Sequence, residues 1–411
     1  MKKKYFLPSI FVLALAMNMI CFTFASAAPV FGDLNNDGKV NSTDSSLLKR
    51  HLLGTSTLSN PLLADVNGDG AVNSTDYSLY KRYLLNVITV FPGQTITVTP
   101  TPTIAPTITP TPVPIRIPNS GSEMDTSSIK TKYINIAYGS VSKTQTLDIY
   151  LPNEGSGPFP VIIAIHGGAF LGGSSKGTDI APMLEGGINH GYAVVSLNYR
   201  LSSEAKFPAG VNDVKAAVRF VRANASKYKF NTDKIAAWGF SSGGFLVSML
   251  GTTGNVSTLD GDTKDNLNYS SDVKAVVDWS GHIDFLTMDD QFRASGIQSA
   301  FGNTNDASSP ASQLIGQLIT KDPTLTEKAN PETYISTMTA ATAPAFLIQH
   351  GSSDNVVPCQ QSINFAAKLK PAIGESKVTL DIINGAGHGG PEFSTASNIS
   401  KVFSFLNSVF K

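Results

Sequence analysis

The stretch Ile235-Ala236-Ala237-Trp238-Gly239-Phe240-Ser241-Ser242-Gly243-Gly244 decides the fold of the larger part of this chain. Its apolar beginning predicts a buried strand, and the apolar run at 245–250 predicts a buried helix. Residues 239–243 fit G-x-S-x-G, a sharp strand-to-helix turn that lifts its middle residue, Ser241, out of the sheet edge. Its glycines supply the backbone freedom that such a turn needs. The start of the helix leaves the amide of Ser242 free to face a developing negative charge.

A second copy of the pattern lies at Gly173-Ser174-Ser175-Lys176-Gly177. It has neither an apolar strand before it nor a helix after it, so we interpret it as a loop. For Ser241 the alternative interpretation is a glycine-rich turn without chemistry, because the pattern alone is common.

Strands and helices alternate from about residue 128 to Lys411, which predicts one α/β domain around a mostly parallel sheet. The predicted strands are 133–138 and 146–151, which form an opening hairpin, and then 161–165, 192–197, 235–238, 273–278, 345–349 and 378–383. Helical spacing marks 211–223 and 400–410. The stretch 282–343 lacks strand rhythm and is predicted to form an insertion over the carboxyl edge of the sheet.

Ligands of open α/β sheets bind beyond the carboxyl ends of the strands, and further motifs lie at such ends. His166-Gly167-Gly168-Ala169-Phe170 follows strand 161–165. We assign the amides of Gly167 and Gly168, with that of Ser242, to an oxyanion hole, and an ordinary glycine turn is the alternative. The stretch 350–358 carries Asp354, and 385–390 carries His388.

These two residues fit a triad with Ser241. Asp354 can orient an imidazole, and His388 can take the serine proton and return it to a leaving alcohol. The other candidates are weighed as follows: His166 and His350 are predicted to shape turns through hydrogen bonds to backbone, His282 is predicted to line the pocket, and Asp278, Asp284 and Asp322 remain rivals of Asp354.

Together these motifs resemble the α/β-hydrolase superfamily, near its hormone-sensitive-lipase-like and carboxylesterase branches, and they are similar to bacterial esterases and acetylxylan esterases with an H-G-G loop and a G-x-S-x-G-G elbow. The likeness covers nearly all of residues 130–411. One departure is Ala169, which stands at the fourth position of the lipase-type H-G-G-G motif. The resemblance implies a serine esterase with the chain order Ser241, Asp354, His388 and no cofactor for catalysis.

Residues 33–54 recur as 65–86, and both copies fit the calcium-loop pattern D-x-[DN]-x-[DN]-G. Calcium prefers oxygen ligands, and a short helix is predicted after each loop, at 44–53 and 76–85. The twelfth position is Asp in both loops, where an EF-hand has Glu. The predicted ligands of two structural calcium ions are Asp33, Asn35, Asp37, the Lys39 carbonyl, Asn41 and Asp44, and then Asp65, Asn67, Asp69, the Ala71 carbonyl, Asn73 and Asp76.

This repeat resembles a type I dockerin, the small all-α module that docks cellulosomal enzymes onto a scaffoldin cohesin domain. The near two-fold repeat implies two docking orientations. The alternative interpretation of the residues at its partner-binding positions is that they cap the helices and form a solvent-exposed face. The resemblance places cohesin contacts at Ser42, Thr43, Lys49 and Arg50, and at Ser74, Thr75, Lys81 and Arg82.

The sequence predicts that the chain is divided into four segments. Residues 1–28 are typical of a secretory signal peptide, with lysines at the start, an apolar core and Ala25-Ser26-Ala27 as a cleavage site. The alternative is a membrane anchor, for which the apolar core is short. The dockerin spans 29–91, a Thr/Pro-rich linker spans 92–125 and favours extended polyproline II, and the esterase domain spans 126–411.

Charge and cysteine content exclude other classes. Lys+Arg and Asp+Glu are both 31, so no basic field for nucleic acid is evident, and no later stretch predicts a membrane span. Of the two cysteines, cleavage of the signal peptide would leave Cys359, so no intramolecular disulfide is expected. We interpret Cys359 as a small buried apolar residue.

The pairing of dockerin and esterase motifs predicts a secreted, cellulosomal serine carbohydrate esterase that deacetylates xylan or a related hemicellulose of the plant cell wall. Feruloyl ester cleavage is the alternative, since Phe170, Phe240 and Trp279 could form an aromatic wall. A peptidase of the same fold and a catalytically inactive carbohydrate-binding domain are weaker alternatives.

Overall fold

The computed structural model describes residues 31–35, 39–58, 63–67, 71–84, 91, 123–261 and 265–411. The chain divides into two compact units, Met1–Ala105 and Pro106–Lys411. The predicted signal peptide and residues 92–122 of the predicted linker lie outside the described residues. Within the described ranges, no helix has the length and apolar character needed to cross a bilayer.

The larger unit is built on an eight-stranded sheet in the order β1-β2-β4-β3-β5-β6-β7-β8. From β4 through β8 neighbouring strands are parallel, whereas β2 pairs antiparallel with β1 and with β4. The strands are β1 (Thr131–Ala137), β2 (Thr146–Leu151), β3 (Phe159–Ile165), β4 (Ala193–Leu197), β5 (Phe230–Phe240), β6 (Ala275–Trp279), β7 (Ala345–Gly351) and β8 (Val378–Ile383).

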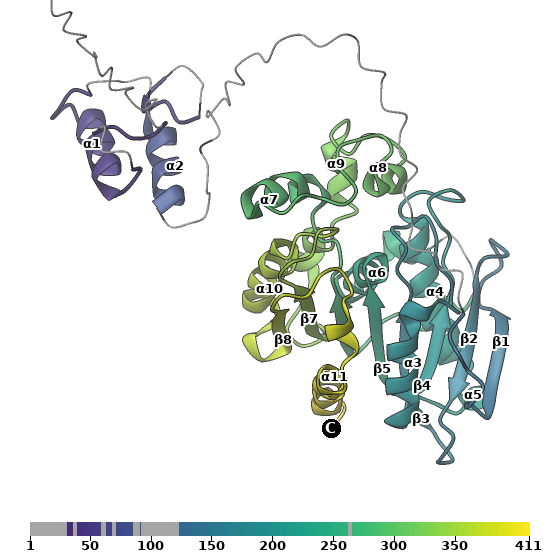
Figure 1. Cartoon of the computed structure of the whole chain (residues 1–411). Coiled ribbons are helices and arrows are strands. Elements are labelled where there is room, and N and C mark those ends of the chain that lie inside the picture. The colour runs from purple at the N-terminus through teal and green to yellow at the C-terminus, as the bar shows by residue number, and fades with distance from the viewer. Residues whose placement is uncertain are drawn as a thin grey trace, which may run out of the picture. The chain divides into compact units, whose positions relative to one another are not determined.

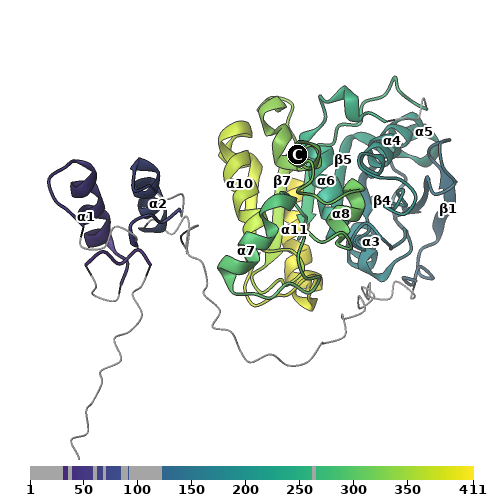
Figure 2. The same cartoon turned by 90° about the horizontal axis from the view of Figure 1, so that it is seen from above.

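Helices cover both faces of this sheet (Figures 1 and 2). Side chains alternate between the faces, so Val161 and Ile163 belong to one core and Ile162 belongs to the other. The first core includes α4 (Ala209–Ala223), α6 (Ser242–Thr252) and α10 (Gln360–Ile373), and the second includes α3 (Ala181–Asn189) and α11 (Ala396–Val409). Shorter helices are α5 (Ala225–Tyr228), η2 (Thr178–Ile180), η3 (Ser257–Leu259), η6 (Glu375–Lys377) and η7 (Pro391–Ser394).

The predicted hairpin and every predicted strand are present, and β5 extends the predicted elbow strand at both ends. The helices α3 and α10 were not predicted. Glycines 186 and 187 lie inside α3 and Pro371 lies inside α10, and these residue types disfavour helix in isolation. Packing against the sheet overrides that preference.

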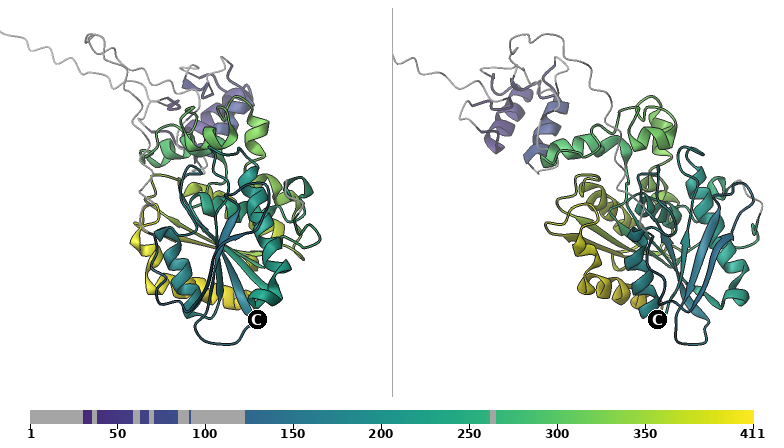
Figure 3. Two further views of the ribbon diagram at one scale, coloured as in Figure 1. Left: turned by 90° about the vertical axis from the view of Figure 1, so that its right-hand side faces the viewer. Right: turned by 45° about the vertical axis from the view of Figure 1, so that its right-hand side comes forward.

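The stretch 282–343 forms short helices between β6 and β7, as expected for an insertion. Figures 1 and 3 show α7, α8 and α9 beyond the end of the sheet to which the β5 arrow points, which is the carboxyl end of the parallel strands. The elements are η4 (Phe285–Thr287), α7 (Met288–Ser295), α8 (Pro310–Ile315), α9 (Pro323–Glu327) and η5 (Pro331–Thr337).

The smaller unit contains α1 (Ser42–Leu52) and α2 (Ser74–Leu84). Both begin two residues earlier than predicted. The reason is capping, because the Asn41 side chain accepts a hydrogen bond from Thr43 N at 2.7 Å and Asn73 accepts one from Thr75 N at 2.7 Å. A small core packs between the helices, and its buried members are Leu34, Leu48, Ala64, Val66, Leu79, Tyr80 and Phe91.

Candidate active site

The predicted elbow is present at the junction of β5 and α6. Ser241 lies between them with φ +58°, a backbone conformation that costs a non-glycine residue about 1–3 kcal/mol and is held by its surroundings. Its amide donates to Trp279 O at 2.8 Å. A Cβ atom on Gly239 would come within 2.1 Å of Gly243 O, so the turn requires glycine there. The second pattern match, at 173–177, is an irregular turn, as predicted.

Three loops far apart in sequence bring the predicted triad together. The Nε2 atom of His388 lies 2.8 Å from Ser241 Oγ, and its Nδ1 atom lies 2.7 Å from Asp354 Oδ2. Asp354 follows β7 and His388 follows β8, so the sheet topology delivers both side chains to the carboxyl edge. The arrangement can pass a proton from the hydroxyl to an imidazole that a carboxylate orients.

The Asp354 carboxylate is held from two sides. Its Oδ1 atom accepts hydrogen bonds from Val356 N at 2.8 Å and Val357 N at 2.9 Å. Burial alone would raise the pKa of Asp354, but the charge of His388 and the hydrogen bonds of His350 and His388 outweigh burial and hold that pKa well below its usual range. Asp354 therefore stays ionised while buried.

His350 contributes more than the sequence predicted. Its Nε2 atom donates to Val357 O at 2.9 Å and its Nδ1 accepts from Ser362 Oγ at 2.7 Å, so the predicted turn-shaping bond to backbone is confirmed. The same Nε2 lies 3.3 Å from Asp354 Oδ2. His350 is therefore a second neighbour of the triad carboxylate, which its i,i+4 spacing from Asp354 could have suggested.

The rival aspartates have other partners. Asp278 accepts from Ser248 Oγ at 2.7 Å and from Gly281 N at 2.8 Å, inside the core. Asp284 caps η4 through Leu286 N, and Asp322 caps α9 through Leu325 N. The geometry thus places only Asp354 of these four against His388 among the described contacts.

One predicted oxyanion donor needs correction. The amide of Gly167 donates to Asp179 Oδ2 at 2.7 Å, so it is already occupied and the prediction for Gly167 is wrong. In the described part of the chain, the amides of Gly168, Ala169 and Ser242 have no protein acceptor. We revise the donor set to these three.

The loop that carries these amides is tightly constrained. Gly168 has φ +113°, and a Cβ atom there would come within 2.2 Å of Gly172 O. Ala169 and Phe170 also have positive φ, at +56° and +64°. His166 at the base of the loop lies 2.7 Å from Gly167 O through Nδ1 and stacks on Tyr199 at 4.4 Å, which confirms its predicted turn-shaping role.

The predicted aromatic wall is mostly buried elsewhere. Trp279 donates to Gln349 Oε1 at 2.7 Å and packs in the core on Trp238, and Phe170 is buried against Phe245. Only Phe240 of the predicted three is partly exposed, with its ring 4.8 Å from that of His388. The prediction that Trp279 and Phe170 face the substrate is therefore wrong.

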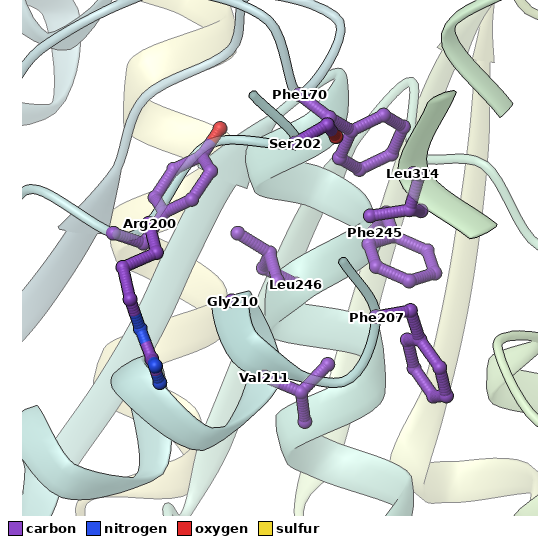
Figure 4. Close-up of a pocket in the computed structure, with 10 residues that line it drawn as sticks. Phe170, Arg200, Ser202, Phe207, Gly210, Val211, Phe245, Leu246 and Leu314 are labelled. Carbon is purple, nitrogen blue, oxygen red and sulfur yellow. The ribbon is translucent and has the colours of Figure 1, made fainter. Parts of the chain in front are cut away.

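Behind the oxyanion loop lies a small apolar hollow (Figure 4). The rings of Phe170, Phe207 and Phe245 gather around it with Leu246 and Leu314, which come from α6, α8 and the loop before α4. This hollow backs the loop mainly with apolar side chains, and Ser202 N donates to Phe170 O at 2.8 Å.

Cys359 is the N-cap residue of α10 and is only partly buried, which corrects the expectation of a buried residue. Burial and the nearby charge of Asp354 raise the pKa of its thiol, so the unreactive protonated form is favoured, in line with its interpretation as a residue without chemistry.

Most of the predicted calcium ligands lie among the described residues. Asp37 and Asp69 lie outside the described residues. Asp33, Asp44 and Asp76 are buried, and Asp44 accepts hydrogen bonds from the amides of Leu34, Asn35 and Asn41. Asp76 accepts from the amides of Asn67 and Asn73. Among the residues that the structure describes, no three His, Cys, Asp or Glu side chains form a metal-binding group.

These carboxylates lie close together in space. Burial raises the pKa of Tyr80, and the charges of Asp44, Asp76 and Asp33 raise it further, while its hydroxyl donates to Gly32 O at 2.8 Å. Buried carboxylates gathered in two matched loops suit a hard cation such as calcium. Asn35, Lys39, Asn41, Asp65, Asn67, Ala71 and Asn73 are also among the described residues, so they complete the predicted sets apart from Asp37 and Asp69.

The predicted cohesin contacts are exposed. They begin and end the two helices, and Lys81 lies over the ring of Tyr77 at 4.9 Å. The side chain of Arg82 lies outside the described residues. The exposed members are Ser42, Thr43, Lys49, Arg50, Ser74, Thr75 and Lys81.

Comparison with known families agrees with this architecture. The BD-FAE family model matches residues 147–369, and the Dockerin type I domain model matches residues 31–85. The chain therefore belongs to the BD-FAE family of α/β-hydrolase esterases and carries a type I dockerin domain.

Curated relatives include two proteins of Mycobacterium tuberculosis (strain ATCC 25618 / H37Rv). The chain is 29% identical over 260 residues to Esterase LipC and 29% identical over 247 residues to the probable carboxylic ester hydrolase LipM. These matches cover 62% and 57% of this chain, and the chain spans only 59% and 51% of the two relatives.

Two solved structures with the same fold are more than 30% identical to this chain. A truncated carbohydrate esterase from gut microbiota is 32% identical, with a TM-score of 0.61 over 70% of this chain and 99% of that one. A bifunctional GH43-CE protein of Bacteroides eggerthii is 33% identical, with a TM-score of 0.59 over 68% of this chain and 35% of that one.

Proposed function

We propose that this protein is a secreted serine carbohydrate esterase that removes acetyl groups from xylan or a related hemicellulose. The observation that carries the proposal is the hydrogen-bonded series Ser241–His388–Asp354 at the carboxyl edge of the sheet. The dockerin domain and the likeness to carbohydrate esterases support the choice of a polysaccharide ester.

The first half of the reaction acylates Ser241. His388 Nε2 takes the hydroxyl proton while Ser241 Oγ bonds to the ester carbonyl carbon, and the carbonyl oxygen gains the negative charge. When this intermediate collapses, the bond to the sugar oxygen breaks and His388 gives its proton to that oxygen. Asp354 stabilises the imidazolium that exists between the two transfers.

The second half releases the acid. His388 takes a proton from water as the water oxygen attacks the acyl carbon, and the proton then returns to Ser241 Oγ as acetate leaves. The amides of Gly168, Ala169 and Ser242 are proposed to stabilise the oxyanion in both halves. Each such donor contributes about 3–4 kcal/mol in enzymes of this kind.

The dockerin determines where the proposed enzyme acts. We propose a signal peptide at 1–28, a dockerin at 29–91, a linker at 92–125 and a catalytic domain at 126–411, with secretion and attachment to a scaffoldin cohesin. Two calcium ions would be held by the predicted loop residues, and they would stabilise the loops that position α1 and α2.

The test is acetate release from acetylated xylan by the wild type and by Ser241→Ala. We expect the variant to lose activity and to lose labelling by a fluorophosphonate probe. Acetate release that survives in Ser241→Ala would refute the nucleophile, and a wild type that the probe fails to label would favour an inactive carbohydrate-binding domain. Methyl ferulate serves as the competing substrate for the feruloyl alternative.

A further inference from the structure

His282 stands apart from the other histidines of this chain. It follows β6, and among the described residues its buried Nδ1 atom has no hydrogen-bond partner. Each of the others has at least one, and these are His51, His166, His190, His350 and His388. A buried polar side chain without a protein partner needs another explanation, because leaving it unpaired costs about 1–3 kcal/mol.

The surroundings of His282 keep its ring neutral. The side chain is 6% exposed, and its ring packs against Phe170 at 5.4 Å and Phe285 at 5.6 Å. Burial lowers the pKa of His282 to about 3, and the charge of His388 lowers it as well. A neutral imidazole offers one N–H donor and one acceptor nitrogen.

His282 also forms part of the wall of a pocket beside the triad. Val356, whose amide holds Asp354, lines the same pocket, together with Met288 of α7 and Phe301. His282 lies close enough to His388 and Asp354 for their charges to affect its pKa. The cavity measures about 20 Å³, enough for one water-sized group such as a hydroxyl.

We propose that His282 recognises a hydroxyl group of the substrate, and that this hydroxyl belongs to the sugar ring that carries the ester. A hydroxyl both donates and accepts, so it matches a neutral imidazole, which offers one donor and one acceptor. An acetyl group carries no hydroxyl, but the sugar carries one next to the ester. Met288, Phe301 and Pro310 form the apolar part of the pocket wall, beside the polar residues Asn303 and Thr304.

This inference rests on the proposed function, and it is tested by a ratio of substrates. The numerator is kcat/KM for a monoacetylated methyl xyloside with a free neighbouring hydroxyl, and the denominator is kcat/KM for 4-nitrophenyl acetate. His282→Phe keeps a ring but removes both nitrogens. We expect it to lower the ratio about tenfold, the effect of losing one hydrogen bond to an unpaired partner.

Two further variants separate recognition from packing. His282→Asn restores a donor and an acceptor, and we expect it to recover part of the ratio. Phe285→Leu disturbs the packing around the same ring without lining the pocket, and we expect it to leave the ratio at the wild-type value. Thermal unfolding of all variants checks that the domain is folded.

Each remaining outcome decides against the inference. An unchanged ratio in folded His282→Phe, or an equal loss on both substrates, would mean that His282 supports the triad and reads no hydroxyl. If the variant instead loses discrimination between methyl 4-hydroxycinnamate and methyl cinnamate, the hydroxyl belongs to the acyl group and the sugar assignment fails. A wild type inactive on all these esters would refute the proposed function itself.

Discussion

Asp179 Oδ2 accepts a hydrogen bond from Gly167 N at 2.7 Å, which ties the start of the oxyanion loop to η2 in front of α3. This bond occupies one amide and leaves those of Gly168 and Ala169 for a ligand. Since Ala169 has positive φ, the loop needs such an anchor to hold its conformation.

We therefore expect Asp179→Ala to lower kcat on 4-nitrophenyl acetate about 10- to 100-fold with little change in KM. The anchor acts on transition-state stabilisation rather than on substrate binding, so kcat is the sensitive quantity. Asp179→Asn keeps an acceptor oxygen and is expected to lose less than Asp179→Ala. Equal losses in both variants, or a loss confined to KM, would contradict an anchoring role.

Replacement of Asp354 by Asn should impair proton transfer. Asn presents an amide in place of the carboxylate that accepts from His388 Nδ1, so the imidazole loses its orienting partner and its counter-charge. We expect kcat to fall by about 10²–10⁴ while KM stays within about threefold. Asp284→Asn is the matched control because Asp284 caps η4. A larger loss in the control than in Asp354→Asn would exclude Asp354 as the triad acid.

Asp278 should make stability depend on pH. Burial raises the pKa of Asp278 to about 6, against an ordinary value of about 3.9 in the unfolded chain. As pH rises, the unfolded chain releases this proton first. The contribution of Asp278 to the free energy of unfolding is therefore fully present below pH of about 4 and is lost as the pH passes 6.

Asp278→Asn removes that titration while keeping an acceptor for Gly281 N. We expect the difference in unfolding free energy, variant minus wild type, to rise by about 2 kcal/mol between pH 4.5 and 7.5. Urea denaturation at a series of pH values measures it. Two stability curves that run parallel over this interval would show that the carboxyl group titrates normally.

Calcium removal should affect the dockerin alone. We expect calorimetry of the full chain to find two calcium sites, reduced to one in Asp44→Ala and in Asp76→Ala, because each carboxylate organises one loop. EGTA is expected to abolish cohesin binding while the rate on 4-nitrophenyl acetate persists. Asp233→Ala, an exposed acid of the larger unit, is the control. Two intact sites in both loop variants would overturn the ligand assignment.

Much of the fold could be predicted because apolar runs mark buried strands directly. The run 161–165 and the elbow at 239–243 each became the predicted element at the predicted place. The order of Ser241, Asp354 and His388 along these strands was enough to predict their meeting, because parallel strands deliver their carboxyl ends to one edge.

The errors have two different physical origins. Trp279 shares strand parity with Ala275 and Val277, and all three pack on the face covered by α3 and α11, so alternation alone could have excluded it from the pocket. No sequence pattern predicts the hydrogen bond from Gly167 N to Asp179. Every residue has a backbone amide, and only the folded loop determines which amides find an acceptor.

The helices α7 to α9 are inserted between two adjacent parallel strands, and the three reacting side chains lie outside that segment. Part of the pocket wall is therefore encoded in a stretch of chain separate from the reacting side chains, while His282 and Val356 lie outside that stretch. Grafting the stretch 288–337 from a relative onto this scaffold would exchange the outer wall of the pocket while the proton-transfer machinery stays in place. Replacement of this segment can therefore change the range of substrates while Ser241, Asp354 and His388 stay the same.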